Sequence, residues 1–287
     1  MDGPDVIVVG DVMVDVAVAA PALVRGGDVH GDVRLRPGGS GANAAVWASA
    51  AGARVTLYGR VGGDVAGRLV SEAVRERGVD ARLTVDPDVR TGSVLTVLEA
   101  GERSMAADRG ANARVTPDDL PSLLEARAVL VSGYLLLHDS SRPAASLALE
   151  RARAEHVAVD AASWPLVREM GAQRFLSATE RATLLLANED EARALVDGTP
   201  EDAARDLVKG FAWVVVKLGA RGALSARDAT VTRVSPPVVS ESDATGAGDA
   251  FDGVLLARLA LGDPHDEALG KAAEAGARVA SSFEPWP

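Results

Sequence analysis

The chain has 287 residues, of which 47% are hydrophobic and only 3% aromatic, and its formal net charge is −11. This negative charge argues against nucleic acid or an anionic membrane as a partner, because both require a basic protein face. The absence of cysteine excludes disulfides, thiolate metal sites and cysteine nucleophiles.

The N-terminus runs from acidic residues directly into an apolar segment, Val6–Val9, which predicts a strand. It has neither the basic region nor the cleavage sequence of a signal peptide, and no later apolar run reaches the length of a membrane span. We therefore expect a cytoplasmic protein.

Strand-like and helix-like segments then alternate along the chain. Strands are predicted over residues 54–59, 128–132, 157–160, 183–187 and 213–218, followed by a hairpin over 223–226 and 230–234. Helices are predicted over residues 41–51, 65–78, 143–155, 189–196, 200–209, 249–261 and 266–281. The alternation predicts an α/β fold, with a doubly wound and mostly parallel sheet flanked by helices, in a single domain over residues 1–287.

Two segments interrupt this alternation, residues 12–36 and 91–108. Both contain glycines and alternating residues without a helical pattern, and strands are predicted over 93–99 and 103–106. We expect the two segments to project from the parallel sheet as one small antiparallel layer. Such a layer can act as a lid over the carboxyl edge of the sheet, where open α/β proteins bind their ligands.

The most informative segment is Asp-Ala-Thr-Gly-Ala-Gly-Asp-Ala-Phe, residues 243–251, which leads into an apolar helix. Glycines at 246 and 248 allow tight turns in which backbone N–H groups converge, and such groups at a helix N-terminus bind anions. Asp249 is either an ordinary helix cap or a base that takes a proton from a hydroxyl while the N–H groups hold a phosphoryl group. The loop alone does not decide between these two interpretations.

This segment resembles the C-terminal signature of the ribokinase-like carbohydrate kinases, also called the PfkB family. The resemblance implies that Asp249 is the catalytic base. It also implies that Gly246, Ala247 and Gly248 form the anion hole, the group of N–H donors around the transferred phosphoryl group.

A second motif, Pro-Gly-Gly-Ser-Gly-Ala-Asn at residues 37–43, resembles the N-terminal signature of the same family. Taken alone it is a glycine-rich loop that leads into a helix, but paired with the Asp249 motif it implies a sugar site. Ser40 stands where some members carry a lysine that reaches the ATP phosphates, so phosphate binding here must depend on the loop and the metal. The substrate contacts that the resemblance implies are Asp15, Gly38, Gly39, Asn43 and Asn112.

Two further motifs resemble the nucleotide site of the family. Asn-Glu-Asp-Glu at 188–191 implies that Glu191 organises Mg²⁺ through water, and the alternative is an ordinary acidic helix N-terminus. Val-Lys-Leu-Gly-Ala-Arg-Gly at 216–222 resembles the strand and turn beside the nucleotide, and the alternative for Lys217 is a charge at a strand end. The ATP contacts that the resemblance implies are Asn188, Lys217, Gly219, Gly222 and Thr245.

The resemblance also implies a K⁺ site formed by Asp243 and a C-terminal loop. In this sequence that loop is 281–287, which lacks the glycine usual in the family. A homodimer formed through the lid is a further implication of the resemblance.

These motifs together predict an ATP-dependent kinase that phosphorylates a hydroxyl of a small sugar or sugar-like substrate, with ATP and Mg²⁺ as cofactors. Three alternatives stay open. A nucleoside kinase is disfavoured by the low aromatic content. A kinase of phosphorylated sugars is allowed by the arginines in and near the lid. A non-catalytic sugar sensor would have no need of an intact Asp249.

Overall fold

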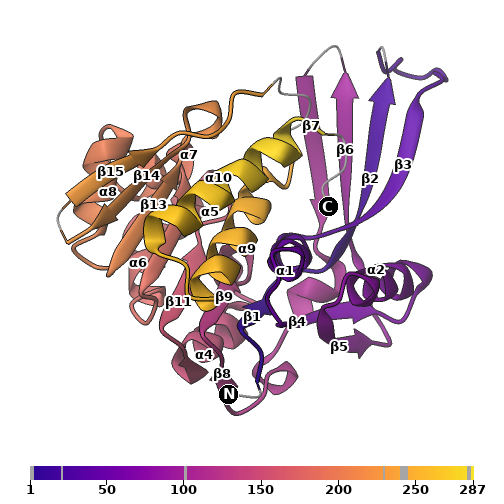
Figure 1. The fold of residues 1–287 in the computed structure, drawn as a ribbon. Helices are drawn as coiled ribbons and strands as arrows, with labels where there is room; N and C mark the ends of the chain where they lie inside the picture. Colours follow the sequence, from indigo (N-terminus) through magenta and orange to yellow (C-terminus); the bar gives the residue numbers. More distant parts are fainter. Residues whose placement is uncertain (1–2, 21, 100–101, 229, 240–244, 283–285) are drawn as a thin grey trace.

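The computed structural model describes residues 3–20, 22–99, 102–228, 230–239, 245–282 and 286–287. Within these residues the largest element is a nine-stranded sheet in the order β15-β14-β13-β12-β11-β9-β1-β4-β5 (Figure 1). The strands from β5 to β13 in this order are parallel, and β14 and β15 are antiparallel. Their bounds are Val6–Val9 (β1), Val55–Gly62 (β4), Asp80–Asp86 (β5), Ala128–Ser132 (β9), His156–Asp160 (β11), Leu184–Asn188 (β12), Trp213–Lys217 (β13), Ala223–Arg227 (β14) and Thr230–Val234 (β15).

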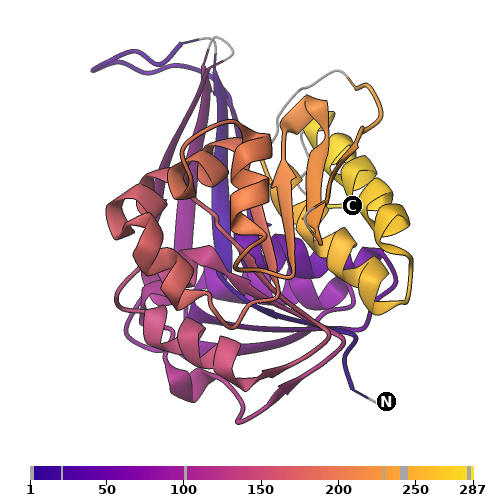
Figure 2. The same cartoon turned by 90° about the vertical axis from the view of Figure 1, so that its left-hand side faces the viewer.

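Helices cover both faces of this sheet, and Figure 2 shows the yellow α9 and α10 on one side of it. Successive strand side chains point to opposite faces, so Val6 and Val8 enter one core while Ile7 and Val9 enter the other. The first core is covered by α1 (Ser40–Ala50), α2 (Val65–Glu76), α9 (Ala247–Ala260) and α10 (His265–Ala280). The second is covered by α3 (Gly133–Leu137), α4 (Arg142–Arg151), α5 (Trp164–Met170), α6 (Ala172–Ala178), α7 (Glu189–Leu195) and α8 (Pro200–Leu207).

The predicted doubly wound α/β fold is confirmed, including the terminal hairpin of β14 and β15. The sequence pattern did not predict β5, α3, α5 or α6. The edge strand β5 is exposed at several positions, and α5 and α6 have seven residues each with few buried side chains. Such elements carry little hydrophobic periodicity, which is the signal that sequence patterns detect.

A second sheet of four strands, in the order β3-β2-β6-β7, rises from one end of the main sheet and is called the lid below (Figure 1). Its outer pairs are antiparallel as predicted, whereas the central pair of β2 and β6 is parallel. This follows because β2 and β6 both lead away from the main sheet, and each returns through its own neighbour. The bounds are Met13–Ala20 (β2), Asp32–Gly38 (β3), Gly92–Glu99 (β6) and Glu102–Asp108 (β7).

The remaining elements are short. The strands β8 (Leu124–Glu125) and β10 (Ala152–Arg153) form a two-stranded pair. The 3₁₀ turns are η1 (Gly110–Arg114), η2 (Pro117–Asp119) and η3 (Gly219–Arg221). In the part of the chain that the structure describes, no helix has both the length and the apolar character needed to cross a membrane.

The close crossing of α1 and α9 depends on Gly253, where an added Cβ would lie 2.2 Å from the carbonyl oxygen of Ala44. We expect Gly253→Ala to lower the free energy of unfolding by about 1–3 kcal/mol, because the two backbones must separate. In the matched control, Gly270→Ala in α10, the new Cβ meets no atom within 4 Å. That change should raise the stability by about 0.4–1 kcal/mol.

Urea unfolding of both variants checks this expectation. Equal effects of the two substitutions would show that the contact between α1 and α9 is not tight.

Candidate active site

Helix α9 begins within the segment 243–251, which resembles the C-terminal signature of the family. Gly246 precedes the helix in the left-handed conformation, with φ 80°, which glycine adopts without strain. The helix therefore begins at Ala247, and Asp249 lies in its first turn. The first N–H groups of a helix have no acceptor within the helix, so they are available to an anion. The residues Asp243 and Ala244, and with them the predicted K⁺ ligand, lie outside the described residues.

The Asp249 carboxylate is held by two side chains of α1. Asn43 donates from Nδ2 to Asp249 Oδ2 over 2.8 Å, and the Ser40 hydroxyl also bonds to the carboxylate. Burial raises the pKa of Asp249 to about 6, the bond from Asn43 opposes that rise, and the charge of Asp160 adds to it. A carboxylate with this pKa is mostly ionised at neutral pH and is still basic enough to accept a proton.

A buried cluster of charges lies next to the first turn of α9, where the anion hole is predicted. The Nζ of Lys217, at the end of β13, lies 2.8 Å and 3.0 Å from the two carboxylate oxygens of Asp252 and 3.2 Å from Asp160 Oδ1. Burial raises the pKa of Asp252 well above its ordinary value, although Lys217 opposes this. An added Cβ on Gly248 would lie 3.4 Å from Lys217 Nζ, so the ammonium group lies close to the first turn of α9.

Glu191 completes this acidic side of the site from the first turn of α7. It forms a capping box with Asn188: its Oε2 accepts from the Asn188 N–H, and its Oε1 accepts from Nδ2. Burial raises the pKa of Glu191 to about 7, and the charge of Asp160 adds to the rise. This geometry is therefore compatible both with Glu191 as a helix cap and with Glu191 as a residue that binds Mg²⁺ through water.

The donor set fits a Mg²⁺ ion bound through phosphates and water. Besides burial, the charge of Asp160 raises the pKa of Glu191, Asp249 and Asp252, and the charge of Lys217 lowers the pKa of all three. This excess of negative charge is what a divalent cation would neutralise. Over the described ranges of the chain, no three histidine, aspartate or glutamate side chains are grouped to hold a metal directly, so few protein ligands would be involved.

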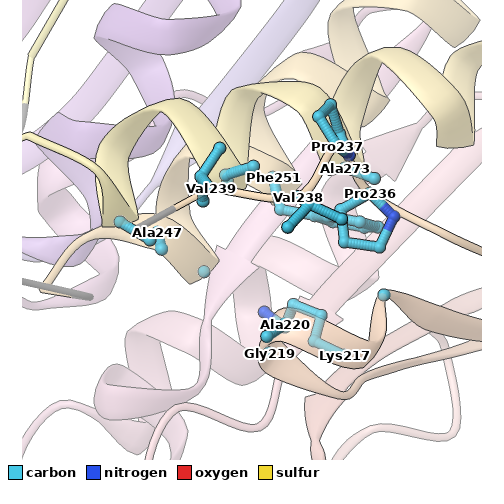
Figure 3. Close-up of a pocket in the computed structure, with 15 residues that line it drawn as sticks. Lys217, Gly219, Ala220, Pro236, Pro237, Val238, Val239, Ala247, Phe251 and Ala273 are labelled. Carbon is cyan, nitrogen blue, oxygen red and sulfur yellow. The ribbon is translucent and has the colours of Figure 1, made fainter. Parts of the chain in front are cut away.

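A cavity of about 220 Å³ opens beside the predicted anion hole, with Ala247 and Gly248 among its lining residues (Figure 3). Its walls are mostly apolar, with Gly219 and Ala220 on one side and residues 236–239 on the other. Gly222 has φ 86°, and an added Cβ would lie 1.9 Å from the carbonyl oxygen of Val234, so only glycine fits there. The lining residues are Lys217, Gly219, Ala220, Gly222, Pro236, Pro237, Val238, Val239, Ala247, Gly248, Phe251, Ala273, Gly276, Ala277 and Ala280.

The predicted substrate residues meet where the lid joins α1. An added Cβ on Gly38 would lie 2.6 Å from the Asp15 carboxylate, and one on Gly39 would lie 2.5 Å from the carbonyl oxygen of Asp11. Asn43 follows one helical turn later and reaches Asp249. The structure therefore brings the N-terminal motif and the C-terminal motif together at one site.

Asn112 lies in a different environment from the other predicted substrate residues. Its side chain is fully buried in η1, and its amide accepts from the N–H of Val12 and donates to the Val12 carbonyl. This contact braces the start of β2 against the end of the lid. A role for Asn112 in substrate contact stays a prediction.

None of Asp160, Asp252 and Trp286 was assigned to the site from the sequence. Asp252 follows Asp249 by three positions in an otherwise apolar helix, so it lies on nearly the same face, and this spacing was a usable signal. Trp286 donates from its indole N–H to Asn43 Oδ1 across 243 residues of sequence. A contact between residues so far apart in the sequence leaves no local pattern from which it could be predicted.

Comparison with known proteins supplies the family. Residues 4–285 match the model described as "pfkB family carbohydrate kinase". The chain belongs to the PfkB family of carbohydrate kinases. The predicted resemblance is thereby confirmed, and the chain is an ATP-dependent kinase of this family.

Relatives of this PfkB kinase are similar over most of their length. A 2-dehydro-3-deoxygluconokinase from Thermoproteus tenax is 34% identical over 263 residues, which cover 84% of this chain and 78% of the relative. The fructokinase from Vibrio cholerae O395, solved with fructose, ADP and calcium, is 26% identical with a TM-score of 0.83, covering 98% of this chain and 94% of its own. The adenosine kinase from Sinorhizobium meliloti, at 23% identity, shares the fold with a TM-score of 0.90, covering 99% and 96%.

Proposed function

We propose that this PfkB kinase transfers the γ-phosphoryl group of ATP to a hydroxyl of a small sugar or sugar-like substrate, with Asp249 as general base. The observation that carries the proposal is the position of Asp249. Its carboxylate has a pKa of about 6, lies in the first turn of α9 beside the anion hole, and bonds to Asn43 of the substrate motif.

In this proposal, different residues bind the sugar, accept its proton and stabilise the transferred phosphoryl group. The sugar lies against Asp15, Gly38, Gly39 and Asn43, with its reacting hydroxyl toward Asp249. As the hydroxyl oxygen attacks the γ-phosphorus, Asp249 accepts the proton, and the bond from the γ-phosphorus to the ADP oxygen breaks. The N–H groups of 246–248 stabilise the negative charge on the transferred phosphoryl oxygens.

The nucleotide is assigned to the cavity of Figure 3, because its apolar walls end at the anion hole and Lys217. The V. cholerae fructokinase, which was solved with ADP, supports a nucleotide site in this fold. Glu191 would hold a water of the metal, and Mg²⁺ bound to the phosphates would neutralise their charge. Asn188 and Thr245 are proposed to contact ATP at the same edge.

The acceptor is proposed to be a sugar because two of the three relatives are named for a sugar or a sugar acid. A nucleoside is the second candidate, since the adenosine kinase has the same fold. Release of ADP over a panel of sugars, sugar acids, phosphorylated sugars and nucleosides distinguishes them. Turnover with nucleosides alone would contradict the sugar assignment, and specific binding of a sugar without turnover would favour a sensor.

The pH dependence of turnover is a further expectation. A base must be ionised, so kcat/KM for the sugar should fall by about tenfold per pH unit below pH of about 6, where Asp249 gains a proton. Because Glu191 titrates at about 7 nearby, Glu191→Gln serves as the control. The decrease of kcat/KM below about pH 6 should remain in Glu191→Gln. A profile that stays flat from pH 5 to pH 8 would contradict the role of Asp249.

The lid is proposed to form a homodimer contact. Val33 and Leu35 of β3 and Leu95 of β6 are exposed, and the strand register places them on one face. An exposed apolar face of this kind is suited to a second copy of the chain. Sedimentation of the protein at micromolar concentration tests this, and a monomer would contradict it.

A further inference from the structure

A chain of two hydrogen bonds connects the C-terminal segment to the proposed base. The indole Nε1 of Trp286 donates to Asn43 Oδ1 over 2.7 Å, and Asn43 Nδ2 donates to Asp249 Oδ2 over 2.8 Å. Trp286 and Asn43 are buried, with 8% and 6% of their surfaces exposed. Both bonds therefore lie largely away from water, where a hydrogen bond is electrostatically stronger than at the surface.

Contacts with the core and with Arg77 fix the position of the Trp286 indole, and therefore the direction of its N–H group. Trp286 packs into the core that α1 and α9 share. The guanidinium of Arg77, at the end of α2, lies 5.7 Å from the centroid of its ring. Arg77 also donates to the carbonyl oxygen of Pro287, so one guanidinium contacts both the indole ring and the residue that follows it.

This contact decides which way the Asn43 amide faces. The indole N–H of Trp286 can only donate, so the atom opposite it must be the Oδ1 of Asn43. The Nδ2 then faces Asp249, where it donates to the carboxylate. In the flipped orientation Oδ1 would face the carboxylate, with two acceptors in contact, and Nδ2 would face the indole N–H. Both contacts would be unfavourable.

We propose that Trp286 is a positioning residue of the phosphoryl-transfer site: by fixing the Asn43 amide, it holds the base in place and keeps a donor directed at it. The inference rests on the proposed role of Asp249 as base. It also defines what Asn43 offers to the substrate. The Nδ2 of Asn43 has one hydrogen that is not directed at Asp249, and a sugar hydroxyl that contacts this hydrogen must act as the acceptor.

Other groups also influence the Asp249 carboxylate, and they stay in place when Trp286 is changed. They come from α1, from the ends of β11 and β13, from α9 itself and from the neighbouring α3 and α7. These groups are Ser40, Asp160, Lys217, Asp252 and Tyr134, and Glu191 interacts with the same cluster through Asp160 and Lys217. A change at Trp286 therefore tests the Asn43 bond without altering the remaining charges.

The test compares Trp286→Phe with Trp213→Phe. Each change removes one buried indole N–H and keeps an aromatic ring, but the Trp213 indole donates to Ser225 on β14, away from the site. The pKa of Asp249 is measured directly from the ¹³C shift of its carboxyl group, assigned with Asp249→Asn. We expect Trp286→Phe to raise this pKa by about 0.5–1 unit, and Trp213→Phe to leave it unchanged.

Turnover gives the second readout. The raised pKa should lower kcat/KM about two- to fivefold at pH 6 and leave it close to the parent value at pH 8. In an Asn43→Ala background, Trp286→Phe should cause no further shift of the pKa, because the effect passes through Asn43. If the phenylalanine variant is too unstable to study, Arg77→Gln, which loosens the same segment, should shift the pKa in the same direction.

An unchanged Asp249 pKa in Trp286→Phe would overturn the inference, as would equal shifts in both tryptophan variants or a shift that persists without Asn43. The carboxyl titration needs no turnover. If the protein transfers no phosphoryl group to any sugar but the titration behaves as expected, the proposed function fails and the positioning contact stands. If turnover occurs and the titration does not respond, the positioning contact alone fails.

Discussion

Replacing Asp249 by asparagine is expected to lower kcat about 10²–10⁴-fold, with little change in the KM for ATP. Asparagine has nearly the same size, and its amide oxygen can still accept the hydrogen bond from Asn43. It cannot take the proton of the substrate hydroxyl. The loss should therefore appear in the chemical step, and steady-state kinetics with a saturating sugar measures it.

A matched control separates the two interpretations of Asp249. Asp266 is also an acid in the first turn of a helix, α10, but it is exposed. If Asp249 were only a cap, Asp249→Asn and Asp266→Asn would both cost a few tenths of a kcal/mol of stability, about the size of a helix-dipole effect, and would leave kcat alike. A kcat that is equal in the two variants would contradict the role of base.

The second large effect is expected at Lys217. Changing it to methionine should lower the free energy of unfolding by about 3–5 kcal/mol, because Asp252 and Asp160 are then buried without their cation. Lys271→Met is the control, since Lys271 pairs with Asp263 and Glu267 at the surface. Because solvent screens these two surface ion pairs, their loss should destabilise the protein far less than the loss of Lys217.

The pH dependence of the stability defect in Lys217→Met tests whether the defect comes from the unpaired Asp252 carboxylate. Burial already raises the pKa of Asp252 in the folded protein, and loss of Lys217 must raise it further. A carboxyl group whose pKa is higher in the folded state favours folding at low pH, and this contribution is lost as the pH rises through the folded pKa. The defect of Lys217→Met should therefore shrink as the pH falls from 7 to 5. A defect that is constant over this range would contradict the account.

Much of the fold could be predicted because buried parallel strands are almost entirely apolar. Val6–Val9 and Ala128–Ser132 are buried at every position, and the predicted bounds match the observed ones. The parallel pairing of β2 with β6 could not be predicted, since the strands are far apart in sequence and the lid pattern is the same for either direction. Such pairing is set by how the chain leaves the core.

The candidate site was predictable where chemistry leaves a local pattern. The glycines around 246–248 and the motif that ends at Asn43 stand in short segments, and the structure brings these segments together. Asp252 was missed because a charged residue in a helix is usually exposed, and only the tertiary contact with Lys217 shows that it is buried. The hydrogen bond from Trp286 to Asn43 could not be predicted either, because it forms only when the fold brings these distant residues together.

In the proposed reaction, this chain transfers the γ-phosphoryl group of ATP to a sugar hydroxyl, with Asp249 as the base. The most direct test is mass spectrometry of the acceptor after incubation with ATP and Mg²⁺, with the parent protein, Asp249→Asn and Asp266→Asn side by side. We predict a phosphorylated sugar with the parent protein and with Asp266→Asn, and at most a trace with Asp249→Asn. Equal phosphorylation by Asp249→Asn, or release of ADP without any phosphorylated acceptor, would contradict the account.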